Sequence, residues 1–292
     1  MRLVAVYNVW GDEQLLNLSI KNIRPLVDGI IVIYSTVSNY GEAIFDFNFH
    51  EDIDYFKFTP ILSSTPMANE TAKRNAGLNK AREKGYTHFI MMDADEFYEP
   101  QEFLKGKRRF EVDDLSGLVC RTKVYFRSPK LTIGYDTTLV PFIHKITDGL
   151  KFEFNKNYPF AWTDTDGVPF TPNRRIRIDP TRSMNISSDV FWSGITMHHF
   201  SWVRSDIQKK IRNSTARQNI ERSTIIADYC NAKAGYYCEF YKTRLEACDN
   251  LFHIPEITDG NISTPYTTGK PDTSGSNPGP NRPLEGYNNP LR

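Results

Sequence analysis

The sequence predicts an α/β fold in which a mostly parallel sheet is covered by helices. Short apolar runs alternate with longer amphipathic stretches through the first half of the chain, and this alternation is typical of parallel sheets. Residues 89–92 are apolar, as buried strands are, and end directly in the carboxylates Asp93, Asp95 and Glu96. Because open α/β sheets bind ligands at the carboxyl ends of their strands, a site is expected there.

The first strand and the first helix are predicted close to the N-terminus. Residues 3–8 are short and apolar, which indicates a buried strand. Residues 11–23 carry leucines and isoleucines in a broad apolar stripe, and Pro25 helps to end that helix. Residues 29–34 are rich in β-branched side chains, so they predict the second strand.

A second strand–helix–strand unit leads to the acidic turn. Residues 54–58 predict a short third strand. Residues 69–84 predict a helix with small alanines along it, and Gly85 follows at its end, where glycine is favoured. Residues 87–92 then predict the strand that ends in the carboxylates. The parallel part of the sheet is therefore expected within the first hundred residues.

The pattern changes after Pro100, where longer strands and irregular segments follow. Ser205 has the character of a helix N-cap with Asp206 behind it, and a further helical stretch is predicted over residues 220–250. The strands predicted in this half are residues 118–126, 138–146, 174–178 and 190–198.

Composition and charge exclude several classes of protein. The chain of 292 residues has 36 Lys and Arg against 35 Asp and Glu, so it lacks the basic field expected of a nucleic-acid-binding protein. Its longest apolar runs fall short of a membrane span, and the N-terminal residues do not form a signal-peptide pattern. These features predict a soluble, cytoplasmic protein without nucleic-acid partners, and they leave the oligomeric state open.

Four motifs stand out, namely residues 4–20, Arg74-Asn75 with Gly77, Asp93-Ala94-Asp95-Glu96 with Pro100, and His199-Phe200-Ser201-Trp202. Together they resemble the nucleotide-sugar-dependent glycosyltransferases of the GT-A fold. The N-terminal segment resembles family 2, whereas the acidic motif and a downstream histidine segment are similar to family 17 N-acetylglucosaminyltransferases. The resemblance covers roughly the first hundred residues and one later patch.

This resemblance implies a GT-A type domain, with a Rossmann-like, mostly parallel central sheet and helices on both faces. A smaller acceptor-side region and C-terminal helices would complete it. Residues 1–255 would form this single domain, with residues 1–100 as the nucleotide-binding half and residues 101–255 as the acceptor half. Residues 256–292 are rich in Pro, Gly and Asn, which predicts an extended or disordered tail.

The resemblance also implies an activity and a metal ion. The expected enzyme is a metal-dependent hexosyl- or pentosyltransferase that moves a sugar from a UDP-sugar to a glycan or other hydroxyl acceptor, in surface or capsid glycan synthesis. Asp95 would bind Mn²⁺ or Mg²⁺ directly, and Asp93 would reach the metal or the ribose through water. His199 would complete the metal shell, with His198 as a weaker candidate, and imidazole suits Mn²⁺ better than Mg²⁺.

The remaining binding residues follow from the same resemblance. Residues 34–38 contain no acid, although family 2 enzymes usually place an aspartate after the second strand to read the base or ribose. The pyrimidine contact therefore stays open. The predicted nucleotide contacts are Tyr7, Asn8, Arg74, Asn75, Asp93 and Lys209, with Lys210 as the alternative to Lys209.

An inverting transferase needs a carboxylate that takes the proton of the acceptor hydroxyl. Asp164 and Asp166 are the predicted catalytic pair, because they lie in a loop with three aromatic side chains of the kind that stack on sugars. A solvated aspartate turn would look the same, and a retaining mechanism would need no such base. The competing carboxylates are Asp136, Glu153 and Asp189.

Two other functions are compatible with the same pattern. A sugar nucleotidyltransferase would use a related α/β sheet, but it needs a glycine-rich phosphate loop after the first strand, and residues 8–11 do not provide one. A carbohydrate-binding protein of the same fold without turnover is the other alternative.

Overall fold

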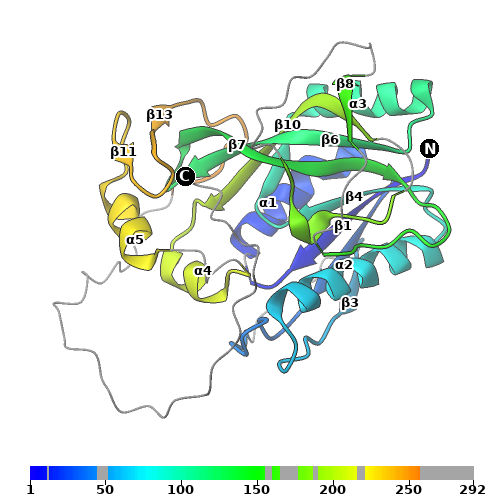
Figure 1. Cartoon of the computed structure of the whole chain (residues 1–292), viewed down its shortest axis with the longest axis horizontal. Helices are drawn as coiled ribbons and strands as arrows, with labels where there is room; N and C mark the ends of the chain where they lie inside the picture. Colours follow the sequence, from blue (N-terminus) through cyan, green and yellow to red (C-terminus); the bar gives the residue numbers. More distant parts are fainter. Residues whose placement is uncertain are drawn as a thin grey trace.

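One large mixed sheet organises the chain (Figure 1). The computed structural model describes residues 1–11, 13–44, 52–154, 160–164, 177–186, 190–215 and 221–256. Neighbouring strands of the sheet are, in spatial order, β3 (Asp54–Lys57), β2 (Gly29–Tyr34), β1 (Leu3–Val9), β4 (His88–Asp93), β7 (Ser128–Lys145), β6 (Gly117–Phe126), β10 (Val190–Trp202) and β5 (Glu96–Tyr98).

The pairing pattern confirms the predicted mostly parallel α/β sheet. Strands β3, β2, β1 and β4 all run parallel, and so do β6 and β10. The long strand β7 is antiparallel to both β4 and β6, and the short strand β5 is antiparallel to β10. Three further short strands join this sheet, which are β8 (Phe160–Asp164) beside β10, β9 (Arg177–Ile178) beside β7, and β13 (Glu246–Ala247), also beside β7. The parallel half therefore ends at β4, where the acidic turn begins.

Helices cover both faces of the parallel half, which explains why its strands are apolar throughout. Alternate residues of β1 enter two separate cores. One core contains side chains of α1 (Glu13–Ile23) and α3 (Pro100–Asp113). The other contains Leu78 and Ala81 of α2 (Pro66–Glu83). A Cβ atom on Gly77 would lie only 2.4 Å from Val6 Cγ1, so glycine is what lets α2 approach the sheet so closely.

Helix α3 is an element that the sequence reasoning missed. It begins at Pro100, and the Glu99 carboxylate caps it by accepting from the Glu102 backbone N–H at 3.3 Å. Only Phe103, Gly106 and Phe110 are buried along it, so its apolar stripe is narrow and its charged residues hide the helical period. The proline that follows a carboxylate was the available signal for its start.

The C-terminal region corrects two predictions. The helix predicted over residues 220–250 is wrong, because α5 (Arg222–Asn231) is followed by a hairpin of β11 (Tyr237–Cys238) and β12 (Thr243–Arg244). Strand β13 (Glu246–Ala247) then joins β7. Helix α4 (Ile207–Asn213) is capped by Asp206 rather than by Ser205, since the Asp206 carboxylate accepts from the Lys209 backbone N–H at 2.7 Å.

A buried carboxylate fixes the turn of that hairpin. Asp228, on α5, is 1% exposed and accepts hydrogen bonds from the backbone N–H groups of Glu239 at 3.1 Å and Phe240 at 2.7 Å. The Tyr236 hydroxyl donates to the same carboxylate at 3.0 Å. These bonds satisfy the backbone in a non-helical form, and they explain why the chain does not continue as a helix after α5.

Asp228→Ala is expected to lower the free energy of unfolding by about 2–4 kcal/mol, because two backbone donors lose a charged acceptor. Asp228→Asn keeps one acceptor oxygen and should lose less. Chemical denaturation measures both changes. The exposed Asp148→Ala is the matched control and should change stability by less than about 0.5 kcal/mol. Equal losses for Asp228→Ala and the control would contradict a structural role for Asp228.

The sequence also led to expectations about membrane-spanning segments and about the C-terminal tail. Within the described residues, no helix is both long enough and apolar enough to cross a membrane. The predicted tail lies outside the described residues, apart from Glu256, whose carboxylate pairs with Lys130 at 3.1 Å.

Candidate active site

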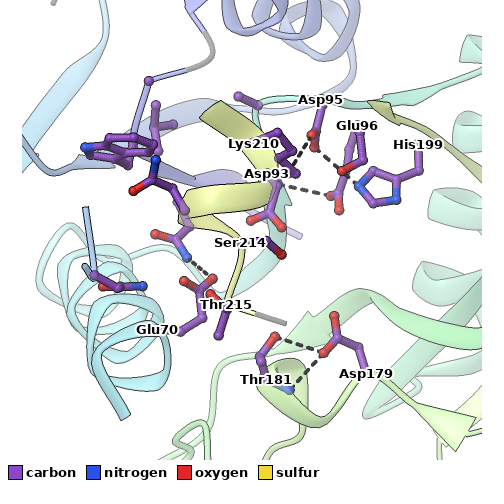
Figure 2. A pocket seen from close by; sticks show the side chains of 18 of the residues that line it. Glu70, Asp93, Asp95, Glu96, Asp179, Thr181, His199, Lys210, Ser214 and Thr215 are labelled. Carbon is purple, nitrogen blue, oxygen red and sulfur yellow. Dashed lines mark hydrogen bonds and ion pairs between the residues drawn. The ribbon is translucent and has the colours of Figure 1, made fainter. Parts of the chain in front are cut away.

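A cavity of about 710 Å³ opens at the carboxyl ends of β1, β2 and β4 (Figure 2). Strands β1 and β4 are parallel neighbours, with Asn8 opposite Asp93, so both strands end at the same edge of the sheet. Residues that follow β2, the first half of α2, strand β7 and the segment around α4 complete the walls. The cavity thus occupies the position at which open α/β sheets bind ligands.

The acidic turn is shaped by the short strand β5. Asp93 ends β4, and Glu96 begins β5, which pairs antiparallel with β10 so that Glu96 lies opposite His199. The Asp95 carbonyl accepts a hydrogen bond from the Phe200 backbone N–H at 2.8 Å. This register carries the downstream histidine to the acidic turn, although about a hundred residues separate them in sequence.

Three cationic groups surround the Asp95 carboxylate, which is 2% exposed. Arg204 lies at 2.8 Å and Lys210 at 3.6 Å from Oδ2, and His199 Nε2 lies 3.4 Å from Oδ1. Burial alone would raise the pKa of Asp95, but Lys210, His199 and Arg204 hold it well below the ordinary value. Burial lowers the pKa of His199, yet the Asp95 charge outweighs it and raises that pKa. Asp95 therefore stays ionised in a buried position.

Asp93 and Glu96 are held by a second pair of cations. Arg182, in a short 3₁₀ turn (Pro180–Arg182), lies 2.7 Å from Asp93 Oδ2 and also pairs with Glu96. Arg74 reaches Asp93 Oδ1 at 3.2 Å. Burial raises the pKa of Asp93, but Arg182 and Arg74 lower it to about 2. Glu96 is fully buried, and burial raises its pKa against the opposing charge of Arg182.

Several buried donors on the cavity wall lack a hydrogen-bond partner among the described residues. Among them are Arg74 Nε and Nη1, the Trp10 indole Nε1 and the Thr122 hydroxyl. Native proteins rarely leave such groups unpaired, so their presence beside a cavity indicates a polar ligand. Arg74 is 2% exposed and carries two of these donors, which makes it the strongest anchor for an anionic group.

Lys73 is a buried lysine between α2 and the end of β1. Its Nζ donates to the Val9 carbonyl at 2.5 Å, and the side chain lines the cavity. Burial lowers the pKa of Lys73 to about 7, although the charges of Glu70 and Asp93 oppose that shift. The unfolded chain keeps an ordinary lysine pKa, so native Lys73 loses its proton at a much lower pH than unfolded Lys73.

This difference predicts a rise of stability with pH. Between pH 7 and 9 the unfolded lysine stays protonated while native Lys73 is losing its proton, so the unfolded state binds more protons. The free energy of unfolding of the wild type, minus that of Lys73→Met, should increase by about 2 kcal/mol over this range. Urea denaturation at each pH tests it. The same difference for the exposed Lys105→Met should stay flat, and a flat result for Lys73 would refute the buried-lysine account.

Most of the predicted nucleotide contacts do line this cavity. Asn8, Arg74, Asp93 and Lys209 are on its wall, as is Lys210. The Asn8 amide donates to Glu70 at 2.5 Å, and Lys209 Nζ lies 5.3 Å from the centre of the Trp10 ring.

Two predicted contacts lie elsewhere among the described residues. Tyr7 is fully buried in the core between the sheet and α1, where its hydroxyl is 2.8 Å from Ser19 Oγ. The Asn75 side chain bonds the backbone of Phe152, accepting at 2.7 Å and donating at 3.0 Å. Neither lines the cavity, because β1 turns Tyr7 into the core and α2 points Asn75 toward the segment after β7. Both have structural roles here.

Two of the three predicted metal ligands lie together. The Asp95 and His199 donor atoms, 3.4 Å apart, are close enough to share one ion, and carboxylate with imidazole is a donor set that Mn²⁺ accepts. Asp93 instead faces Arg74 and Arg182. The described residues contain no group of three or more His, Cys, Asp or Glu side chains arranged to hold a metal. His198 is directed away, because its Nδ1 lies 2.8 Å from the Tyr125 hydroxyl.

The carboxylates considered for the catalytic base differ in whether the structure describes them and in whether they line the cavity. Asp164 is the last residue of β8, and its side chain falls outside what the structure describes, as do Asp166 and Asp189 entirely. Glu153 forms an ion pair with Lys151 at 3.0 Å and is not on the cavity wall. Asp136, on β7, does line the cavity, and its Oδ1 accepts from the Thr138 backbone N–H at 2.9 Å.

Sequence reasoning missed several charged residues of the site, among them Glu70, Lys73, Asp179, Arg182 and Arg204. Arg204 follows the histidine segment closely, so its position at the end of β10 was a usable signal. Lys73 and Glu70 share the helix of Arg74, at helical spacing on one side of it. Arg182 belongs to no motif, and only the three-dimensional structure brings it to the acidic turn.

No protein-family model and no curated protein matches the sequence. Among solved structures, the chain is similar to S. aureus TarS 1-349 in complex with UDP-GlcNAc, with a TM-score of 0.38 and 12% identity over 79% of this chain and 72% of that one. The complex with UDP gives 0.30 and 10%, covering 42% and 36%. A mannose-1-phosphate geranyltransferase from Thermus thermophilus gives 0.27 and 12%, covering 44% and 43%.

The chain thus spans less than half the length of two of these structures. The likenesses are too slight to assign it to a family. The resemblances to family 2 and family 17 stay predictions from the motifs.

Proposed function

We propose that the chain is a GT-A type, metal-dependent glycosyltransferase that takes its sugar from a UDP-sugar. The observation that carries this proposal is one cavity that joins the Asp95–His199 pair to a group of cations and unpaired buried donors at the carboxyl ends of parallel strands. That combination suits an anionic nucleotide with a metal-bound diphosphate. The cations on the wall are Lys73, Arg74, Arg182, Arg204, Lys209 and Lys210.

The nucleotide would occupy the part of the cavity between β1, β2 and α2. Asn8 and Trp10 come from the end of β1, and Arg74 supplies two buried donors without partners among the described residues. Lys209, beside the Trp10 ring, adds a positive charge for the phosphates. Asp93, held by its two arginines, is predicted to reach the ribose or a metal-bound water.

Asp95 and His199 would hold Mn²⁺ or Mg²⁺, with phosphate and water oxygens as the other ligands. When bound, the cation supplies Lewis-acid stabilisation of the charge that develops on the leaving diphosphate. Arg204 and Lys210 keep Asp95 ionised, so it is ready for the metal without a proton to lose. His199 must lose its proton to bind, and its raised pKa predicts weaker metal binding as the pH falls.

The transfer itself would be inverting. An acceptor hydroxyl oxygen forms a bond to the anomeric carbon, the bond from that carbon to the phosphate oxygen breaks, and UDP leaves with the electron pair. A carboxylate takes the hydroxyl proton. Asp164 and Asp166 are the predicted pair for this role, and Asp136 is the described carboxylate on the cavity wall. The product would belong to a surface or capsid glycan.

UDP release from a panel of UDP-hexoses, UDP-N-acetylhexosamines and UDP-xylose, measured with Mn²⁺ or with EDTA, tests the proposal. Release that requires Mn²⁺ is the expected result. Sugar binding without release from any donor would instead indicate a carbohydrate-binding protein without turnover. UDP-sugar formation from UTP and a sugar 1-phosphate would indicate a nucleotidyltransferase.

A further inference from the structure

Three aromatic side chains form one wall of the cavity beyond β4, on the side away from β2. Trp202 ends β10, and Phe240 and Tyr241 come from the turn between β11 and β12. The Trp202 indole N–H donates to the Tyr241 hydroxyl at 2.6 Å. The ring centres of Phe240 and Tyr241 are 5.0 Å apart, and those of Trp202 and Phe240 are 6.1 Å apart. We call these three residues the aromatic wall.

Polar groups of the central strands share the cavity with the aromatic wall. Asp136 and Thr138 of β7 line it, and so does Thr122 of β6. Burial raises the pKa of Tyr241, and the Asp136 charge raises it further. The Thr122 hydroxyl, 4% exposed, has no partner among the described residues. The cavity thus presents aromatic rings, a carboxylate and hydroxyl groups to a ligand.

The aromatic wall is held rigidly before any ligand arrives. The Phe240 backbone is bonded to buried Asp228, and the Tyr241 hydroxyl is bonded to Trp202. A phenol oxygen that accepts one hydrogen bond still carries a hydrogen that it can donate to a ligand. A wall fixed in this way loses little conformational entropy on binding, which favours affinity for a rigid ligand over a flexible one.

We propose that the aromatic wall is the acceptor subsite and that the acceptor is the ring of a glycoside. The apolar face of the sugar would lie against the Phe240 ring, because the Tyr241 ring is turned 86° from it, and the sugar hydroxyl groups would bond Asp136 and Thr122. An acyl chain would leave the buried Thr122 hydroxyl unpaired, and a flexible peptide would gain less from a rigid wall. This inference rests on the proposed function and names the class of its acceptor.

Binding of methyl glycosides of common hexoses and N-acetylhexosamines to the full chain, measured by calorimetry with UDP and Mn²⁺ present, tests the subsite without turnover. At least one glycoside should bind, and Phe240→Ala should weaken it about tenfold. Phe240→Leu keeps apolar volume but loses the ring face, so it should weaken binding similarly while the protein stays folded. Tyr237→Ala is the matched control, because Tyr237 belongs to the same hairpin, is 44% exposed and does not line the cavity.

The outcomes separate this inference from the proposed function. Glycoside binding that is weakened by both Phe240 variants and kept by Tyr237→Ala supports the subsite, whether or not UDP is released from a donor. Absence of binding by every glycoside overturns it, as does equal binding by wild type and Phe240→Leu. Transfer to glycerol or to a serine peptide but to no glycoside also overturns it, and that result would leave the transferase proposal standing.

Discussion

Asp95→Asn is expected to lower the rate of UDP release about 10³-fold, the order of loss seen when one preorganised electrostatic group is removed. The substitution keeps the size of the side chain but removes the charge on which His199, Arg204 and Lys210 converge. Release should be measured at saturating Mn²⁺ and UDP-sugar, so that the loss is read in kcat. Mn²⁺ affinity, measured by calorimetry, should fall in the same variant.

The control for Asp95 is Asp148→Asn, a substitution at an exposed aspartate that should leave kcat within twofold of the wild type. Thermal unfolding must accompany both variants, because three buried or partly buried cations lose their shared partner in Asp95→Asn. A folded Asp95→Asn protein with full activity would mean that the acidic turn has a structural role alone.

Arg182→Met is expected to cause the largest loss of stability, about 3–5 kcal/mol, the cost of leaving a buried charge without its partner. Arg182 is 2% exposed and bonds Asp93 and the fully buried Glu96. Denaturation at pH 8 should show the full loss. At pH 5 the loss should be smaller, because an unpaired buried glutamate can then take up a proton and become neutral.

A second substitution separates the charge effect from a packing effect. Arg182→Met combined with Glu96→Gln should recover part of the stability, since the unpaired carboxylate is gone. Arg24→Ala removes an exposed pair with Asp52, where the side chains are 41% and 66% exposed, and should cost no more than about 1 kcal/mol. Equal losses for Arg182→Met and Arg24→Ala would contradict a buried charge network beneath the site.

Local sequence patterns were sufficient for the parallel half of the fold. Strands β1, β2 and β4 are buried on both faces, so their sequences read as continuous apolar runs that few other elements produce. Helix α3 escaped because charged residues hide its narrow apolar stripe, and the β11–β12 hairpin escaped because its turn depends on a carboxylate from α5. The Asp228 carboxylate is the clearest case, since nothing in residues 236–240 indicates that a buried acid will hold them.

In the candidate site, too, some contacts could be predicted from the sequence and others could not. The Asp95–His199 contact was implied by the resemblance to GT-A transferases, and the pairing of β5 with β10 is the physical reason for it. Arg182 and Lys73 were missed because a lone basic residue has no sequence signature. The acids in the cavity need buried positive partners, and this need is visible only once the acids are known to be buried.

A crystal structure of the chain soaked with UDP and Mn²⁺ tests the central claim most directly. The account predicts one metal ion bound by Asp95 and His199, a diphosphate beside that ion and near Lys209 or Lys210, and a nucleoside between Asn8 and Arg74. UDP bound on another surface, or a metal ion that leaves the Asp95–Arg204 and Asp95–His199 contacts intact and binds elsewhere, would contradict it.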